Sequence, residues 1–179
     1  MVYLFLADGF EIIEALSPVD MLRRAKLDVK TVGVTGKKVS SSCGVEVTAD
    51  ITIEEFEYSN VDAIILPGGM PGTLNLENND IVQCAIDKAV ENNSLVCAIC
   101  AAPSILGHKG LLKRKEATAF PGFEDSLDGA ILSEEYVIKD GNFITARGAG
   151  VSVDFGLEIV KALTDKETAE NIRKTIQCR

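Results

Sequence analysis

The sequence of 179 residues contains no tryptophan and only one histidine, His108. A zinc site built from several histidines is therefore excluded, and any Ser-His-Asp or Cys-His catalytic group would have to use His108. The chain also lacks an uninterrupted apolar run of about 18 residues, so no transmembrane helix is predicted. These absences argue against a histidine-rich metalloenzyme and against a transmembrane helix.

Basic residues are also scarce, with 18 lysines and arginines against 27 aspartates and glutamates, which gives a net charge of −9. Because a surface this acidic repels phosphate backbones, we expect no nucleic-acid partner. The five cysteines are an odd number and no secretory leader pattern accompanies them, so we expect reduced thiols and a cytoplasmic location. The composition is typical of a globular protein, and the length predicts a single domain over residues 1–179.

Short apolar runs alternate along the chain with stretches whose apolar residues recur at helical spacing. Several of the runs do not alternate with polar residues, which is typical of strands buried on both faces of a sheet. The pattern predicts a layered α/β fold with a mostly parallel sheet. In the first helical stretch, Pro18 predicts a kink or a restart of the helix. The predicted strands are Val2–Ala7, Val29–Val34, Ala63–Leu66 and Leu95–Ile99, and the predicted helices are Glu11–Lys26, Ile81–Glu91, Val151–Leu163 and Lys166–Gln177.

Two segments interrupt this alternation and resemble β-hairpins. They are Lys37–Thr48 and Glu134–Thr145, and Asp140-Gly141 provides a typical hairpin turn for the second. We expect both hairpins to contribute antiparallel additions to the sheet.

The ends of three predicted strands carry the residues that are most informative about function. In open α/β sheets, ligands bind beyond the carboxyl ends of the strands. The first strand is followed by an acidic segment that ends at Glu14, the third by Gly68-Gly69 and the fourth by Cys100. If these strands are neighbours, a carboxylate, a glycine turn and a thiol meet in one crevice.

Cys100 stands where an apolar strand gives way to a helix. The small residues Ala98 and Ala102 lie two positions before and after it, as in a nucleophile elbow. At the start of a helix, the helix dipole would stabilise the thiolate, and the backbone amides of Ala101 and Gly69 could bind an oxyanion. The alternative is a buried cysteine with a packing role, which is the commoner fate of a lone cysteine in a strand.

Neither a second cysteine nor the histidine is expected to act with Cys100. Cys97 completes a C-x-x-C motif, but in a strand the two side chains would face opposite ways, and no second cysteine pair exists to complete a zinc site. His108 follows Cys100 by eight residues, about 12 Å along one helix, and would be out of reach of the thiol. We therefore predict no metal at this site.

A carboxylate is the remaining candidate partner for the thiol, and Glu14 is the best placed because it begins an apolar run after the loop of the first strand. A half-buried glutamate has a raised pKa, so it could donate a hydrogen bond to a thiolate or move a substrate proton. Glu11, three residues earlier on the same helical face, is the rival. Either could instead be an ordinary acidic residue at a helix start. The turn at Gly68-Gly69 lacks both common phosphate-binding spacings, so we interpret it as close backbone approach to the site and predict no cofactor.

Five motifs run in order over nearly the whole chain. They are Glu11-Ile12-Ile13-Glu14, Pro18-Val19-Asp20, Leu66-Pro67-Gly68-Gly69, Ala98-Ile99-Cys100-Ala101-Ala102-Pro103 and Thr145-Ala146-Arg147-Gly148-Ala149-Gly150. In this order and spacing they resemble the ThiJ/PfpI superfamily and, within it, the DJ-type group named for Parkinson disease protein 7. The resemblance implies a flavodoxin-like three-layer α/β sandwich that is usually a homodimer.

The resemblance also implies roles for individual residues. Cys100 would be the reactive elbow cysteine and Glu14 its carboxylate partner. The backbone amides beside them would be those of Gly68, Gly69 and Ala101. The residues expected around the pocket or at the dimer contact are Glu11, Asp20, Arg24, Phe120 and Arg147.

Two positions depart from the patterns of related groups. Ala101 stands where the protease-like branch carries a histidine, so proteolysis is not expected. Phe120 stands in a loop where many DJ-type members carry a histidine, so we expect the oxidation chemistry and substrate choice to differ from theirs.

The activities that the resemblance implies all centre on the cysteine. Members of the group convert methylglyoxal to lactate without a metal or glutathione, and reversal of early protein glycation is also attributed to them. The sequence therefore predicts a cysteine-dependent enzyme that acts on small aldehydes or glycated substrates through Cys100 and Glu14. The alternative is an oxidative-stress sensor or chaperone-like protein that uses oxidation of Cys100 without turnover.

Overall fold

A seven-stranded sheet forms the middle layer of the computed structural model, which describes residues 1–178. Its strands are β1 (Val2–Leu6), β2 (Val29–Gly33), β5 (Ile51–Thr52), β6 (Ala63–Leu66), β7 (Leu95–Ile99), β10 (Val137–Asp140) and β11 (Phe143–Ala146). They lie in the order β10-β11-β7-β6-β1-β2-β5. Neighbouring strands run parallel, except that β10 and β11 are antiparallel. The predicted mostly parallel sheet is confirmed.

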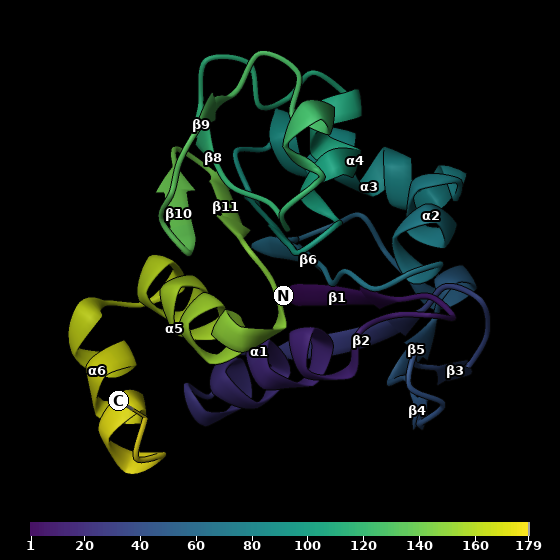
Figure 1. Ribbon diagram of the computed structural model, residues 1–179. Coiled ribbons are helices and arrows are strands. Elements are labelled where there is room, and N and C mark those ends of the chain that lie inside the picture. The colour runs from purple at the N-terminus through teal and green to yellow at the C-terminus, as the bar shows by residue number, and fades with distance from the viewer. Residues whose placement is uncertain (179) are drawn as a thin grey trace.

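Helices cover both faces of this sheet (Figure 1). On one face lie α1 (Ile12–Arg24) and α5 (Ser152–Leu163), with α6 (Lys166–Thr175) packed on α5, and on the other lie α2 (Gly72–Glu77), α3 (Asp80–Glu91) and α4 (Pro103–His108). Three 3-10 helices, η1 (Ile53–Glu55), η2 (Glu124–Ser126) and η3 (Ala149–Val151), lie in connecting segments. The fold is a flavodoxin-like α/β sandwich. Within the described part of the chain, no helix combines the length and apolarity needed to cross a bilayer.

The inner strands β1, β6 and β7 are buried on both faces, as their unbroken apolar runs predict. In β1, Leu4 and Leu6 belong to the core cluster beneath α1 and α5, whereas Tyr3 and Phe5 belong to the cluster beneath α2, α3 and α4. Successive side chains of a strand point to opposite faces, so a strand between two helical layers must be apolar at every position. The four strands and four helices predicted from the sequence are present, with ends that differ by at most two residues.

The sequence predicts a kink or a restart of the first helix at Pro18, but the helix does not restart there. Helix α1 is a single helix, and Pro18 is one of its buried residues. Pro18 faces α5, because a Cβ placed on Gly156 would lie 2.9 Å from the Pro18 Cα atom. The close packing of the two helices therefore holds α1 together across a position that cannot donate a backbone hydrogen bond.

This packing makes Gly156 a sensitive position for stability. We expect Gly156→Ala to lower the free energy of unfolding by about 1–3 kcal/mol, because the added methyl group would collide with the α1 backbone. The higher helix propensity of alanine, worth about 1 kcal/mol, would offset only part of this loss. Urea denaturation measures the difference. Gly150→Ala is the matched control, since a Cβ there meets no atom within 4 Å, and equal stability of the two variants would contradict the expectation.

The two predicted hairpins form, but only one contributes to the central sheet. Strands β3 (Lys38–Ser40) and β4 (Glu46–Thr48) make a separate two-stranded sheet, so the expectation that they extend the main sheet was wrong. The edge beside β2 is already taken by β5, which pairs with it in parallel. The second hairpin is β10-β11, and only β10 is an antiparallel addition. A further short sheet, β8 (Glu116–Ala117) with β9 (Ile131–Leu132), was not anticipated.

Candidate active site

The three strand ends singled out in the sequence converge, because β7, β6 and β1 are adjacent in the sheet. Their carboxyl ends lead to Cys100, to Gly68-Gly69 and to the start of α1, which carries Glu14. The thiol, the glycine turn and the carboxylate therefore meet at this edge of the sheet, as expected.

Cys100 occupies a strained turn directly after β7. Its φ angle is +65°, a left-handed conformation that costs a non-glycine residue about 1 kcal/mol or more. Two backbone hydrogen bonds hold it there: the Cys100 N–H donates to the Ala146 carbonyl, and the Cys100 carbonyl accepts from the Phe120 N–H, both at 2.8 Å. The predicted elbow geometry is thus present, and it is fixed by the end of β11 and by the loop that contains Phe120.

Gly68 lies where the thiol-bearing residue and the carboxylate come closest. A Cβ on Gly68 would lie 2.7 Å from the Cys100 Cβ atom and 2.7 Å from Glu14 Oε2. Since real Cβ contacts are never this short, only glycine allows the two side chains to approach each other across this position. This agrees with the interpretation that the backbone of the glycine turn lies very close to the site.

Glu14 is fully buried, and its two carboxyl oxygens have different surroundings. Oε2 accepts a hydrogen bond of 2.9 Å from the Gly68 amide. Oε1 is buried and has no hydrogen-bond partner within residues 1–178. The carboxyl also interacts with the Cys100 thiol. The Gly68 amide therefore positions the Glu14 carboxylate. This differs from the expectation that the Gly68 amide would be one of the oxyanion donors.

Burial raises the pKa of Glu14 to about 7. The hydrogen bond with the Cys100 thiol opposes this rise, the charge of Glu11 adds to it, and the Gly68 amide opposes it. A carboxyl group that titrates near neutral pH can both accept and release a proton there, which is the property required of a general acid-base group.

The thiol does not behave as the sequence suggested. Burial, together with the charge and hydrogen bond of Glu14, raises the pKa of Cys100 to about 12, and the Ala101 and Gly69 amides only partly oppose this. The expected stabilisation by a helix dipole is weak because α4 has six residues and begins only at Pro103. Cys100 is therefore a neutral thiol next to a carboxyl group, and two backbone amides face its sulfur.

Glu11 supports Glu14 and does not replace it. As the N-cap of α1, Glu11 accepts a hydrogen bond of 2.8 Å from the Glu14 amide through Oε2. Its own amide donates to the Gly68 carbonyl at 2.9 Å. Glu11 thus ties the start of α1 to the glycine turn, which fixes where the Glu14 side chain enters the site.

Asp20 and Arg24 lie further along α1, where they form an exposed ion pair of 2.8 Å with each other. Their expected part in a pocket or dimer contact stays a prediction. His108 ends α4, and its Nδ1 lies 2.5 Å from Glu77 Oε1. Cys97 is fully buried in β7. Within residues 1–178, no group of three or more histidine, cysteine, aspartate or glutamate side chains is arranged to hold a metal ion.

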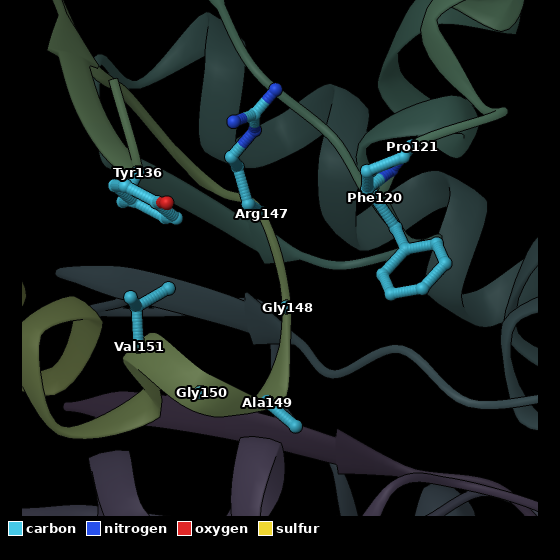
Figure 2. Close-up of a pocket in the computed structure, with 8 residues that line it drawn as sticks. All are labelled: Phe120, Pro121, Tyr136, Arg147, Gly148, Ala149, Gly150 and Val151. Atoms are coloured by element: carbon cyan, nitrogen blue, oxygen red, sulfur yellow. The ribbon is translucent and has the colours of Figure 1, made fainter. Parts of the chain in front are cut away.

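Figure 2 shows the lining of a cavity whose volume is about 490 Å³, and one of its lining residues, Gly148, lies close to the thiol. Gly148 joins the two, because a Cβ at this position would lie 3.9 Å from Cys100 Sγ and 3.1 Å from the Phe120 ring. Phe120 and Arg147, both expected around the pocket, are part of its wall. The lining residues are Phe120, Pro121, Tyr136, Arg147, Gly148, Ala149, Gly150 and Val151.

Tyr136 is the pocket residue that the sequence reasoning missed. Its backbone carbonyl accepts a hydrogen bond of 3.0 Å from the Arg147 amide, and the Arg147 guanidinium lies 5.5 Å from its ring centroid. A signal was present, because Val137 pairs with Ala146 in the β10-β11 hairpin. Extending that register by one residue places Tyr136 opposite Arg147.

Comparisons with known proteins agree with the fold described above. Residues 1–162 match the profile of the DJ-1/PfpI family. The Parkinson disease protein 7 homolog of Danio rerio is 36% identical over 173 residues, which cover 94% of this chain and 92% of the fish protein. Protein DJ-1 homolog B of Arabidopsis thaliana is also 36% identical over 94% of this chain, but the match spans only 39% of the plant protein. The solved structure of oxidized Toxoplasma gondii DJ-1 superposes with a TM-score of 0.95 at 32% identity, covering 99% of this chain and 97% of that one. The chain belongs to the DJ-1/PfpI family.

Proposed function

We propose that the protein is a cofactor-independent, cysteine-dependent enzyme that converts small 2-oxoaldehydes such as methylglyoxal to 2-hydroxy acids, with related activity on early glycation adducts. The observation that carries the proposal is the contact between a neutral Cys100 thiol and a buried Glu14 whose pKa is raised to about 7. A base that is ionised at neutral pH and lies against a thiol can activate it at the moment of attack.

In the first step, Cys100 Sγ bonds to the aldehyde carbon while Glu14 takes the thiol proton. The electron pair of the carbonyl moves to its oxygen, where the Gly69 and Ala101 amides, which already face the sulfur, stabilise the negative charge. Glu14 then returns the proton to this oxygen. The product is a neutral hemithioacetal, and Glu14 is again a carboxylate.

In the second step, Glu14 removes the proton from the former aldehyde carbon and delivers it to the neighbouring carbonyl carbon through an enediol. The hydroxyl proton on the oxygen of the first carbon moves to the oxygen of the second carbon in the same step. The first carbon is oxidised and the second reduced, so no external oxidant or reductant is needed. The resulting thioester on Cys100 is hydrolysed by water to the hydroxy acid, which restores the thiol. Overall, methylglyoxal and water give lactate.

The alternative, an oxidation sensor or chaperone-like protein without turnover, is favoured by a different observation. Cys100 is only partly buried, and Glu14 and the Gly69 and Ala101 amides surround its sulfur with groups that can hydrogen-bond oxygen atoms added to it. The Toxoplasma gondii relative was solved in an oxidized form.

Two parallel assays of the wild-type protein distinguish these functions. We expect methylglyoxal to be consumed and lactate to appear in stoichiometric amounts without glutathione or added metal, as measured by enzymatic lactate assay. Peptide mass spectrometry after mild peroxide treatment reports oxidation at Cys100. Selective sulfinate formation at Cys100 with no lactate would contradict the enzyme and support the sensor.

The proposal includes a homodimer that works in the reducing cytosol. The exposed face of α1, with Ile13 and the Asp20–Arg24 ion pair, is the proposed contact. The free cysteines are consistent with a reducing compartment.

A further inference from the structure

The cavity beside Cys100 has room for the substituent of an aldehyde that is bound at the thiol. Glu14 and the glycine turn fill the space on one side of the thiol, since Gly68 lies in contact distance of both Cys100 and Glu14. On the other side, Gly148 has no side chain, lies near Sγ and is itself part of the cavity lining. A chain attached to the reacting carbon would enter the space of about 490 Å³ beside Gly148, at a place where the Phe120 ring also lies close.

Most of the residues that line this cavity are apolar, and Arg147 is the cation among them. Figure 2 shows its side chain rising from the strand end between Tyr136 and Phe120. Its Nε atom is buried and has no hydrogen-bond partner within residues 1–178, and no carboxylate in that range forms an ion pair with it. Arg23 and Arg24, in contrast, are each paired with an aspartate. Arg147 therefore has no ion-pair partner within residues 1–178, and a cation in a mostly apolar cavity lining favours an anionic ligand.

The groups near Arg147 do not neutralise its charge at close range. The Tyr136 ring offers its face to the guanidinium at 5.5 Å, but it provides no oxygen acceptor in that contact. The Glu124 carboxylate acts on Arg147 only at longer range. Its closer partner is the Gly122 amide at 2.5 Å. Backbone amides hold the pKa of Glu124 below its ordinary value, and the charge of Arg147 has a smaller effect in the same direction.

We propose that Arg147 binds the carboxylate of the substrate, and that the preferred substrates are 2-oxoaldehydes with a carboxylate a few carbons from the reacting carbonyl. The assignment rests on the proposed function and narrows its substrate class. The aldehyde carbon lies at Sγ, its oxygen at the Gly69 and Ala101 amides, and the chain crosses Gly148 to Arg147. Arg147 thus determines specificity and takes no part in the bond changes.

A matched pair of substrates tests this assignment. 4,5-Dioxopentanoate carries the carboxylate, and 2-oxopentanal has the same chain length without it. We expect wild type to prefer the charged substrate in kcat/KM, and Arg147→Met to lower the ratio of charged to neutral kcat/KM by at least about tenfold. Arg147→Lys should retain part of the preference, and Glu124→Gln should increase it, because a competing negative charge is removed. A purely structural role of Arg147 would lower both kcat/KM values together, and an unchanged ratio would overturn the proposal.

A second measurement separates this proposal from the proposed function. Modification of Cys100 by 3-maleimidopropionate and by the neutral 3-maleimidopropionamide needs no turnover, and peptide mass spectrometry follows it. We expect the charged-to-neutral rate ratio at Cys100 to fall in Arg147→Met, while the ratio at the exposed Cys43 serves as the internal reference. If wild type forms no lactate but this ratio falls, the enzyme proposal fails and the anion site stands. If the ratio at Cys100 is unaffected, the anion site is disproved even in an active enzyme.

Discussion

Cys100→Ser is expected to reduce methylglyoxal turnover at least about a thousandfold, because the variant loses the atom that forms the covalent intermediate. The serine hydroxyl is a much weaker nucleophile, and Glu14, with its pKa of about 7, is too weak a base to compensate for this. The backbone hydrogen bonds that hold the elbow do not involve the thiol, so the fold at this turn should persist. Lactate formation under saturating and limiting substrate measures the loss.

Cys43→Ser is the matched control for this variant. Cys43 is an exposed thiol in the β3-β4 hairpin, and it contacts the Ser41 hydroxyl at 3.2 Å. We expect its turnover to equal that of wild type. Retention of more than a few per cent of activity in Cys100→Ser would show that the thiol is not the nucleophile.

Glu14→Gln is expected to lower kcat/KM about a hundredfold to ten-thousandfold, the range typical of losing a general acid-base group. The glutamine carbonyl can still accept the hydrogen bond from Gly68, so the change removes proton transfer with little change of shape. In wild type, kcat/KM should rise with pH through about 7, because the first step needs ionised Glu14. This rise should be absent in Glu14→Gln, and a pH-rate profile of both proteins measures it.

The same variant should be more stable than wild type at pH 8. Burial raises the folded-state pKa of Glu14 from 4.5 to about 7, so the folded protein resists ionisation of this group. The resulting loss in the free energy of unfolding is absent below the unfolded-state pKa of 4.5. It grows as the pH rises from 4.5 to about 7 and is complete above pH 7. Its removal should increase the free energy of unfolding by about 3 kcal/mol at pH 8 and by little at pH 4. Urea denaturation measures the difference. If Glu14→Gln is less stable than wild type at pH 8, the expectation is wrong and unfolding explains the lost activity of this variant.

The placement of Cys100 beside Glu14 could be predicted from the sequence because the geometry of parallel sheets brings strand ends together. Unbroken apolar runs identify the buried strands, and the residues that follow neighbouring strands must meet at one edge. The close approach at Gly68 was predictable for the same reason. These inferences need only periodicity and chain order.

The protonation state of Cys100 could not be predicted in this way. The sequence shows a turn before a helix, but not that α4 begins three residues later and is only six residues long. It also does not show that Glu14 is fully buried against the thiol, which reverses the expected direction of the thiol pKa. Both depend on tertiary contacts between segments far apart in the chain.

The misplaced hairpin has a similar cause. Local alternation and turn residues correctly indicated that Lys37–Thr48 forms a hairpin, but pairing with the main sheet depends on which edge is available. Strand β5 has only two residues, too few to give a periodic signal, yet it occupies the edge beside β2. The two strands of the hairpin therefore pair with each other and with no strand of the main sheet.

Titration of the Cys100 thiol in wild type and in Glu14→Gln tests most directly whether Glu14 acts as a base on a neutral thiol. Thiolate absorbance near 240 nm, with the corresponding Cys100→Ser proteins as blanks, reports the ionisation. The charge of Glu14 raises the pKa of Cys100, so the thiol pKa should be lower in Glu14→Gln by about one unit or more, even though turnover falls. A higher thiol pKa in Glu14→Gln would mean that Glu14 stabilises a pre-formed thiolate, and would contradict the role assigned to it.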